Sequence, residues 1–189
     1  MKEVKAALVL FGLLSLLTGI VYPAAVTGIA AVAFRRSAGG SLIPGRTGIV
    51  GSALIGQWFS GPHYFHGRPS AGNYDGMISG GSNLGPTNAK LVKLARERAE
   101  LIRAENGLAP DVKIPAELVF ASASGLDPHI GLRAARLQVG RIARARKLDE
   151  RTVVEIVMNH AQKKYADLFG EPLINVLAVN RALDVAGGR

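Results

Sequence analysis

Cysteine is absent from all 189 residues. A disulfide framework, a thiolate nucleophile and a zinc site with thiolate ligands are therefore excluded, whichever compartment the chain occupies. Acidic residues are also scarce: 14 Asp and Glu stand against 23 Lys and Arg, which gives a formal net charge of +9. This excess attracts anionic partners such as lipid head groups, an acidic protein surface, nucleotides or nucleic acid, and its sign alone selects none of them.

Residues 6–34 lack any charged side chain and are rich in Leu, Val, Ile and Ala. About 20 apolar residues span the hydrocarbon core of a bilayer, and a helix over this segment would reach roughly 44 Å at about 1.5 Å per residue. We therefore predict one transmembrane helix over residues 6–34, tilted or bent near Pro23. Small residues such as Gly12, Ser15 and Gly19 would let it pack closely against another helix.

A cleaved secretory signal is the alternative interpretation of this segment. Lys2 and Lys5 precede the apolar run, and residues 31–33 satisfy a small-x-small cleavage rule. The apolar region of a signal holds only about 7 to 15 residues, so the length favours a retained anchor. Basic residues flank both ends, with Arg35 and Arg36 on the far side, and the charge pattern leaves the orientation open.

The residues after the helix are numerous enough to bury one core without disulfides or metals. We predict a short tail at 1–5, the transmembrane helix at 6–34, a juxtamembrane linker at 35–46 and one soluble domain at 47–189. The Gly and Pro content of Ser37–Gly45 favours a loop there. The predicted fold class is thus a single N-terminal transmembrane helix plus one mixed α/β soluble domain.

Periodicity and capping residues predict the elements of the soluble domain. Apolar residues and glycines over 48–59 indicate one or two strands. Thr87 or Asn88 can cap a helix that stops at Asn106 and Gly107. A basic amphipathic helix is predicted over 132–147, and a third helix runs from the cap Asp149 to about Phe169. Residues 173–184 fit a short strand or a capped helix equally well.

Residues 60–88 form a long stretch rich in Gly and Pro, with Arg68 and Asp75 as its only charged side chains. Long irregular segments within a domain are more often functional than not. The arginines of 132–147 could bind phosphates, lipid or an acidic partner, or could form a solvated face. Aromatic residues do not interleave with them, which argues against nucleic-acid binding.

Two histidine motifs suggest chemistry only weakly. His63 and His66 are spaced so that a helix could place both imidazoles on one metal ion, but the neighbouring Gly and Pro disfavour a helix, and hydrogen bonding in a loop is preferred. A serine of residues 122–124 could form a triad with His129 and Asp127, yet no Gly-x-Ser-x-Gly elbow is present. Asp127 is better explained as a turn former and His129 as a helix-entry residue.

The glycine-rich segment Ser79, Gly80, Gly81, Ser82 and Asn83 could present successive backbone N–H groups to an anion, because glycine permits a concave nest. The Walker spacing with its lysine is absent. The alternative is a glycine turn that packs beneath another segment.

Ordered motifs along the chain resemble one known family over nearly the whole length. The longest are Ser79–Asn88 and Ser124–Ile130. The remaining matching positions are Thr18-Gly19, Tyr22-Pro23, Phe65, Arg68-Pro69-Ser70, Tyr74-Asp75, Ile114-Pro115-Ala116, Gln138, Arg141, Gly170-Glu171-Pro172, Asn175-Val176-Leu177, Asn180 and Leu183-Asp184. The chain resembles the C subunits of Kdp-type high-affinity potassium-transporting P-type ATPases. Phe120 and Ala123 depart from the pattern, which has Thr and Gly there.

The resemblance implies a non-catalytic subunit of a potassium uptake complex. Its implied partners are an ATP-hydrolysing P-type subunit, a potassium-translocating channel-like subunit and a small single-helix subunit, in contact with membrane lipid and not with nucleic acid. The resemblance also implies an inner-membrane location, with the N-terminus cytoplasmic and the soluble domain extracytoplasmic. The alternative is a membrane-anchored extracytoplasmic enzyme or binding module that acts alone.

The family is further described as a catalytic chaperone that raises the affinity of the pump for ATP. The resemblance implies nucleotide contacts at Ser79, Gly80, Gly81, Ser82 and Gln138, with no tightly bound cofactor and ATP available only through the complex. An extracytoplasmic domain and a cytoplasmic ATP site lie on opposite sides of the membrane, which opposes direct contact. We expect partner contacts from the loops instead, at Asn83, Gly85, Asn88, Asp127 and His129.

Overall fold

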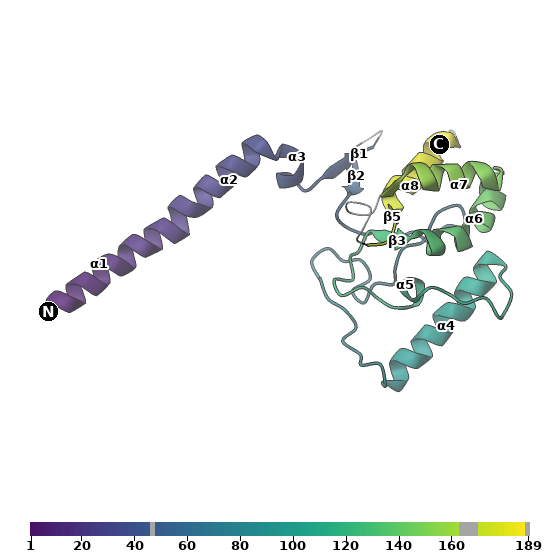
Figure 1. The fold of residues 1–189 in the computed structure, drawn as a ribbon, viewed down its shortest axis with the longest axis horizontal. Helices are drawn as coiled ribbons and strands as arrows, with labels where there is room; N and C mark the ends of the chain where they lie inside the picture. The colour runs from purple at the N-terminus through teal and green to yellow at the C-terminus, as the bar shows by residue number, and fades with distance from the viewer. Residues whose placement is uncertain (46–47, 163–169, 188–189) are drawn as a thin grey trace. The chain divides into compact units, whose positions relative to one another are not determined.

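The structure is a computed structural model that describes residues 1–45, 48–162 and 170–187. The chain divides into two units, residues 1–49 and 50–189. The first is dominated by an exposed apolar helix, and the second is a mixture of helices and short strands (Figure 1). This arrangement confirms the predicted fold class of one long apolar helix and one mixed α/β domain.

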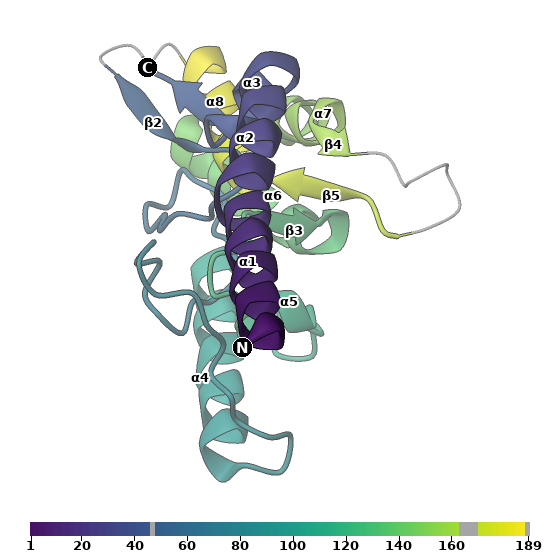
Figure 2. The same ribbon diagram turned by 90° about the vertical axis from the view of Figure 1, so that its left-hand side faces the viewer.

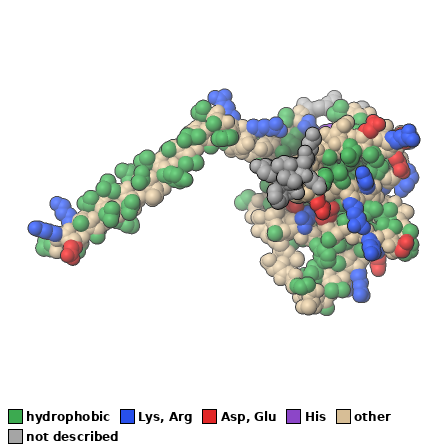
Figure 3. Space-filling view, in the orientation of Figure 1, with side chains coloured by type: hydrophobic (Ala, Val, Ile, Leu, Met, Phe, Trp, Pro, Cys, Tyr) green, Lys and Arg blue, Asp and Glu red, His purple; other side chains and the backbone are tan. Residues whose placement is uncertain are grey.

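The helix of the first unit runs through α1 (Lys2–Leu16), a π-helical turn η1 (Leu17–Val21) and α2 (Tyr22–Ala33). The π turn lies directly before Pro23, whose missing N–H cannot continue a regular α-helical ladder. Lys2–Ala33 has a mean hydropathy of 2.2 and is long and apolar enough to cross a membrane. Figure 3 shows apolar side chains along its whole length and basic side chains at each end.

The segment after this helix is more regular than the sequence suggests. It contains a short helix α3 (Arg35–Ala38) and a strand β1 (Leu42–Pro44), so the loop predicted for Ser37–Gly45 is wrong in part. The strand β2 (Ile49–Ser52) is the regular part of the predicted strand region 48–59, and residues 53–59 are irregular. The long irregular stretch predicted over 60–88 is present.

Helix α4 (Ala89–Asn106) begins where the capping signal places it. The Asn88 side chain accepts a hydrogen bond from the N–H of Lys90, and Gly107 ends the helix in the left-handed conformation that glycine adopts without strain. A short helix α5 (Ala116–Val119) follows. The basic helix α6 (Leu132–Arg146) also agrees with its prediction.

A three-stranded antiparallel sheet with the order β3-β5-β4 lies beside these helices (Figure 2). Its strands are β3 (His129–Gly131), β4 (Ala161–Gln162) and β5 (Leu173–Asn175). Ile130 pairs with Ile174 across β3 and β5, and Ala161 pairs with Ile174 on the other side. The sheet is short, but it connects segments that are distant in sequence.

Two predictions are wrong near this sheet. Helix α7 (Glu150–Asn159) stops well before Phe169, because Ala161 and Gln162 pair with β5 and this pairing overrides helix propensity. Residues 163–169 lie outside the described part. His129 begins strand β3 and does not enter a helix, since its register partner is Asn175.

The C-terminal segment contains both of the alternatives that the sequence left open. Strand β5 passes directly into α8 (Val176–Ala186), whose first turn is capped by the side chain of Asn175. The core is formed where α6, α7 and α8 meet the sheet, with Ile130, Ile142 and Ile174 fully buried. This core fixes the inner face of α6, which carries the polar side chains described next.

Candidate functional site

Two side-chain amides hold the backbone of residues 65–66 as a neighbouring β-strand would. Asn180 Oδ1 accepts a hydrogen bond from the N–H of Phe65 at 2.8 Å, and its Nδ2 donates to the Phe65 carbonyl at 3.0 Å. Gln138 does the same for His66, at 2.8 Å and 3.1 Å. Asn180 is 1% exposed and Gln138 is 2% exposed, so both amides are used inside the domain.

Two arginines of α6 bind the same loop further along. We call Gln138, Asn180, Arg141, Arg146 and Asp184 the clamp. Arg141 donates to the carbonyls of Pro62 at 2.6 Å and Gly61 at 3.4 Å, and its Nε donates to Asn106 Oδ1 at 3.0 Å. Burial is the main reason why the pKa of Arg141 lies below its ordinary value. The predicted solvated or anion-binding role is therefore wrong for this arginine, because its donors are used by two backbone carbonyls and by the side-chain amides of Asn106 and Gln138.

Arg146 closes the same clamp near the C-terminal helix. Its Nε donates to the His63 carbonyl at 2.6 Å, and Nη2 forms an ion pair with Asp184 at 2.8 Å. The guanidinium lies 5.2 Å from the ring centre of Tyr64, within range of a cation–π interaction. The side chain is only 2% exposed, so it too belongs to the interior and not to a basic surface.

A second polar group joins the long loop to the start of β3. Arg68 Nη1 lies 3.1 Å from Asp127 Oδ2, and the N–H of His129 donates to Asp127 Oδ1 at 3.0 Å. The hydrogen bond from the His129 side chain, with help from Arg68, lowers the pKa of Asp127 against the opposing effect of burial. Asp127 thus forms the turn that the sequence predicts.

The considered Ser/His/Asp triad is not assembled. The His129 ring contacts Asp127 at 3.5 Å and Gln162 at 3.1 Å, and within the described residues no serine hydroxyl is bonded to it. Ser124 Oγ instead accepts the N–H of Leu126 at 3.1 Å. No group of three or more His, Cys, Asp or Glu side chains that could hold a metal ion occurs in the part of the chain that the structure describes.

The Ser79–Ser82 segment packs against residues 122–125. The N–H of Gly80 donates to the Ser124 carbonyl at 2.8 Å, and Ser79 Oγ donates to the same oxygen at 3.3 Å. A Cβ on Gly125, which has φ +68°, would lie 2.7 Å from the Gly80 carbonyl. Gly80 and Gly81 do not adopt positive φ. The segment therefore has the geometry of a glycine turn beneath another segment.

The residues predicted as partner contacts have different surroundings. Asn83, with φ 54°, and Gly85 and Asn88 are exposed in the loop before α4, while Asp127 and His129 are partly buried in the turn before β3.

The residues predicted as nucleotide contacts line two different hollows of the surface. Gln138 lines one cavity, and Ser79 lines a separate hollow with Ser124 and Asp127. Their roles stay predictions.

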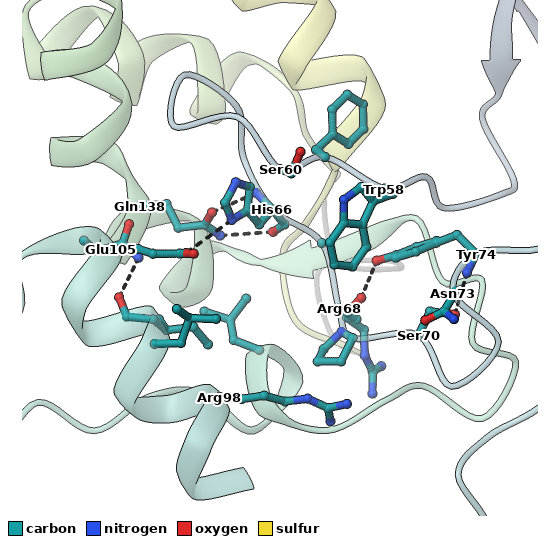
Figure 4. A pocket seen from close by; sticks show the side chains of 17 residues that line it. Trp58, Ser60, His66, Arg68, Ser70, Asn73, Tyr74, Arg98, Glu105 and Gln138 are labelled. Atoms are coloured by element: carbon teal, nitrogen blue, oxygen red, sulfur yellow. Dashed lines mark hydrogen bonds and ion pairs between the residues drawn. The ribbon is translucent and has the colours of Figure 1, made fainter. Parts of the chain in front are cut away.

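The cavity that Gln138 lines has a volume of about 370 Å³ and lies between the long loop and α4 (Figure 4). The aromatic side chains of Trp58 and Tyr74 form one wall, with ring centres 6.1 Å apart in an edge-to-face arrangement. Its charged lining consists of Arg68, Arg98 and Glu105. The other lining residues are Phe59, Ser60, His66, Gly67, Pro69, Ser70, Asn73, Leu101, Ile102, Asn106, Leu118 and Gln138.

Internal hydrogen bonds hold the walls of this cavity in place. The N–H of Tyr74 donates to Ser70 Oγ at 2.9 Å, and the Tyr74 hydroxyl donates to the Arg68 carbonyl. Burial, together with the nearby Asp127 charge, raises the pKa of Tyr74 to about 12, which keeps this hydroxyl protonated well above neutral pH. The walls of the cavity are therefore held by contacts within this chain.

Comparison with known proteins agrees with the sequence motifs. The family model described as "K+-transporting ATPase, c chain" (KdpC) matches residues 4–185. The chain belongs to the KdpC family. Relatives named as potassium-transporting ATPase KdpC subunits include one from Gemmatimonas aurantiaca, 48% identical with 97% of this chain and 93% of the relative covered. Another from Cereibacter sphaeroides is 49% identical over 99% of both chains, and one from Rhodopseudomonas palustris is 45% identical over 98% and 99%.

Membership in the KdpC family confirms the resemblance stated from the sequence. The match covers the apolar helix as well as most of the second unit, since it extends from residue 4 to residue 185. The clamp residues Gln138, Arg141, Asn180 and Asp184 and the loop residue Phe65 are all among the positions that carry the resemblance. Sequence reasoning alone assigned none of them a structural role.

Proposed function

We propose that this chain is a non-catalytic accessory subunit of an ATP-driven potassium uptake complex, needed for its assembly and stability. One observation carries the proposal: the nearly full-length family match includes a helix of 32 residues with no buried residue. Such a helix satisfies its own backbone but not its apolar side chains, so it requires lipid or other membrane helices.

The proposed partners are an ATP-hydrolysing P-type subunit, a potassium-translocating channel-like subunit and a small single-helix subunit. The helix would dock beside them, since Gly12, Gly19 and Gly28 have open space where a Cβ would lie and allow another helix to approach closely. The proposed location is the inner membrane, with the N-terminus in the cytoplasm and the soluble unit on the opposite side.

The soluble unit would raise the affinity of the ATP-hydrolysing subunit for ATP by stabilising the assembly. Two observations favour this indirect route over a direct nucleotide contact. Both Gln138 amide atoms are bonded inside the domain, and the N–H of Gly80 is bonded to Ser124. We propose no tightly bound cofactor, and ATP would be bound only by the complex as a whole.

Co-purification in a mild detergent tests the assembly role. We expect the full-length chain, expressed with the other subunits, to elute with a large polytopic membrane protein. A variant with Gly12, Gly19 and Gly28 changed to Leu should lose most of this association while its soluble unit remains folded. A chain that elutes alone and turns over a substrate would instead support an independent membrane-anchored enzyme.

Orientation requires its own measurement. We expect a reporter fused after residue 189 to be active only outside the cytoplasm, and one fused before residue 1 only inside it. The reverse pattern would overturn the proposed topology and would remove the main objection to direct ATP contact.

A further inference from the structure

Three of the side chains that line the cavity between the long loop and α4 are charged, and they differ in how they are balanced. Arg68 is paired with Asp127 at 3.1 Å. Glu105 faces His66, with 3.6 Å between the carboxylate and Nδ1, and also interacts with the buried Arg141. Arg98 donates to the carbonyl of Val119 at 2.8 Å and forms no ion pair with any residue that the structure describes. A carbonyl is neutral, so the cavity has an unbalanced positive charge at Arg98.

Apolar surface next to this charge is also left open. Trp58 is 68% exposed and Leu101 is 58% exposed, although both line the cavity. Leu101 lies one turn from Arg98 on α4 and contributes to the same lining as Ile102. Trp, Tyr and Arg around a pocket form the composition that carries most of the binding energy in protein interfaces.

The polar framework described above makes this cavity rigid. Gln138 fixes His66 at one side, and Ser70 with Tyr74 fixes the loop at the other. A preformed pocket loses little conformational entropy when an anchor side chain enters it, so affinity is gained. Figure 4 shows the Trp58 and Tyr74 rings on one side of the cavity and the Arg98 side chain extending from α4 on another.

We propose that this cavity is the docking site for a loop of another subunit of the complex, which inserts an acidic side chain toward Arg98 and an apolar side chain against Trp58 and Leu101. The proposal rests on the proposed function, because it takes the partner from the same assembly. Charge complementarity selects an acidic occupant, since the partner carboxylate supplies the anion that Arg98 lacks.

Cross-linking in the intact complex tests the location of the partner. A photoreactive p-benzoylphenylalanine at position 101 should cross-link to another subunit, at a segment that contains Asp or Glu. The same group at position 93 serves as the control, because Lys93 lies on the same helix with 77% of its side chain exposed and does not line the cavity. An assembled complex with no cross-link from position 101 would overturn the docking site and leave the accessory function intact.

Substitution of Arg98 tests the charge. R98E should weaken association of the chain with the complex at least tenfold, whereas R98K keeps the charge and should stay within about threefold of the parent. The control R136E places the same reversal on an exposed arginine of α6 and should have little effect. Equal behaviour of R98E and R136E, with both soluble units folded by circular dichroism, would contradict the proposal.

Two further outcomes separate this inference from its alternatives. If the parent chain does not co-purify with other subunits at all, the proposed function fails and the docking site fails with it. If native mass spectrometry of the complex detects a small organic anion whose binding is abolished by R98E, while position 101 cross-links to no subunit, the cavity is a ligand site and the docking proposal is wrong.

Discussion

Helices α4 and α6 both carry many charged side chains, yet they place them in different environments. On α4 the ion pair between Lys93 and Glu97 has side chains 77% and 55% exposed, and Asn106 is the only buried residue. On α6 Gln138 and Arg141 are buried and bonded to the loop of residues 61–66. A run of charges along a helix therefore does not by itself identify a surface, because long side chains can turn inward toward backbone carbonyls.

The largest effect is expected from Arg141. Its replacement in R141M leaves the carbonyls of Gly61 and Pro62 and the side chain of Asn106 without their donor. Each buried acceptor that loses its donor costs about 1–3 kcal/mol, so we expect the free energy of unfolding to fall by about 3–5 kcal/mol in total. Urea denaturation of the full-length chain in detergent, followed by the fluorescence of Trp58, measures it.

The matched control for Arg141 is R136M, an exposed arginine on the same helix. We expect it to change the free energy of unfolding by less than about 0.5 kcal/mol. Similar losses in the two variants would mean that α6 does not use its charges as described, and the contrast with α4 would disappear.

Gln138 gives the next largest effect. Q138A removes both bonds to His66 and the acceptor of Arg141 Nη2, and it leaves a partly buried N–H and carbonyl unsatisfied. The loss of these bonds costs about 2–3 kcal/mol in total. N180A makes the equivalent change at Phe65 and should cost a similar amount. Thermal unfolding of both variants checks the prediction.

The same pair of variants sharpens the question of nucleotide contact. Under the structural role, Q138A and N180A should change the ATP affinity of the purified complex to the same small extent, because both act only on the fold. A loss of ATP affinity confined to Q138A, with unfolding like that of the parent, would instead support a direct contact at Gln138.

On α4 we expect the cap to contribute more to stability than the exposed ion pair between Lys93 and Glu97. N88A removes the bond from Asn88 Oδ1 to the N–H of Lys90, which spans 2.9 Å. Loss of such a cap costs about 1 kcal/mol, whereas K93A removes an exposed pair worth at most about 0.5 kcal/mol. Urea denaturation of both variants ranks them, and a larger loss in K93A would contradict the description of the Lys93–Glu97 pair as solvated.

The ends of α4 were predictable from sequence because capping is local. Asn88 and Gly107 lie at the two boundaries, and their conformational preferences act within one turn. The end of α7 was not predictable, since the pairing of Ala161 with Ile174 depends on a strand that follows much later. Local signals therefore predicted the ends of α4, whereas the end of α7 depends on long-range strand pairing.

The clamp was hidden from sequence reasoning for a related reason. Gln138 bonds to His66 and Asn180 bonds to Phe65, residues 72 and 115 positions away. Their acceptors and donors are backbone atoms, which every residue has, so no side-chain pattern marks the partner. Phe65, Gln138 and Asn180 all belong to the family motifs. Their joint presence there was the one signal in the sequence that could have pointed to the clamp.

His66 connects the two helices of this comparison, and it gives the smallest effect we expect. Its backbone is held by Gln138 of α6, and its ring lies 3.6 Å from Glu105 of α4. Burial, reinforced by the charge of Arg141, lowers the pKa of His66 below 6.5. The folded state thus disfavours the protonated ring, and the unfolded chain binds more protons as the pH falls through 6.5. Stability should decrease from pH 7 towards the lower folded pKa. H66Q should flatten this part of the curve in thermal unfolding scans at constant ionic strength. An unchanged slope would contradict the prediction, because it would show that Glu105 and solvent already stabilise the protonated His66 ring.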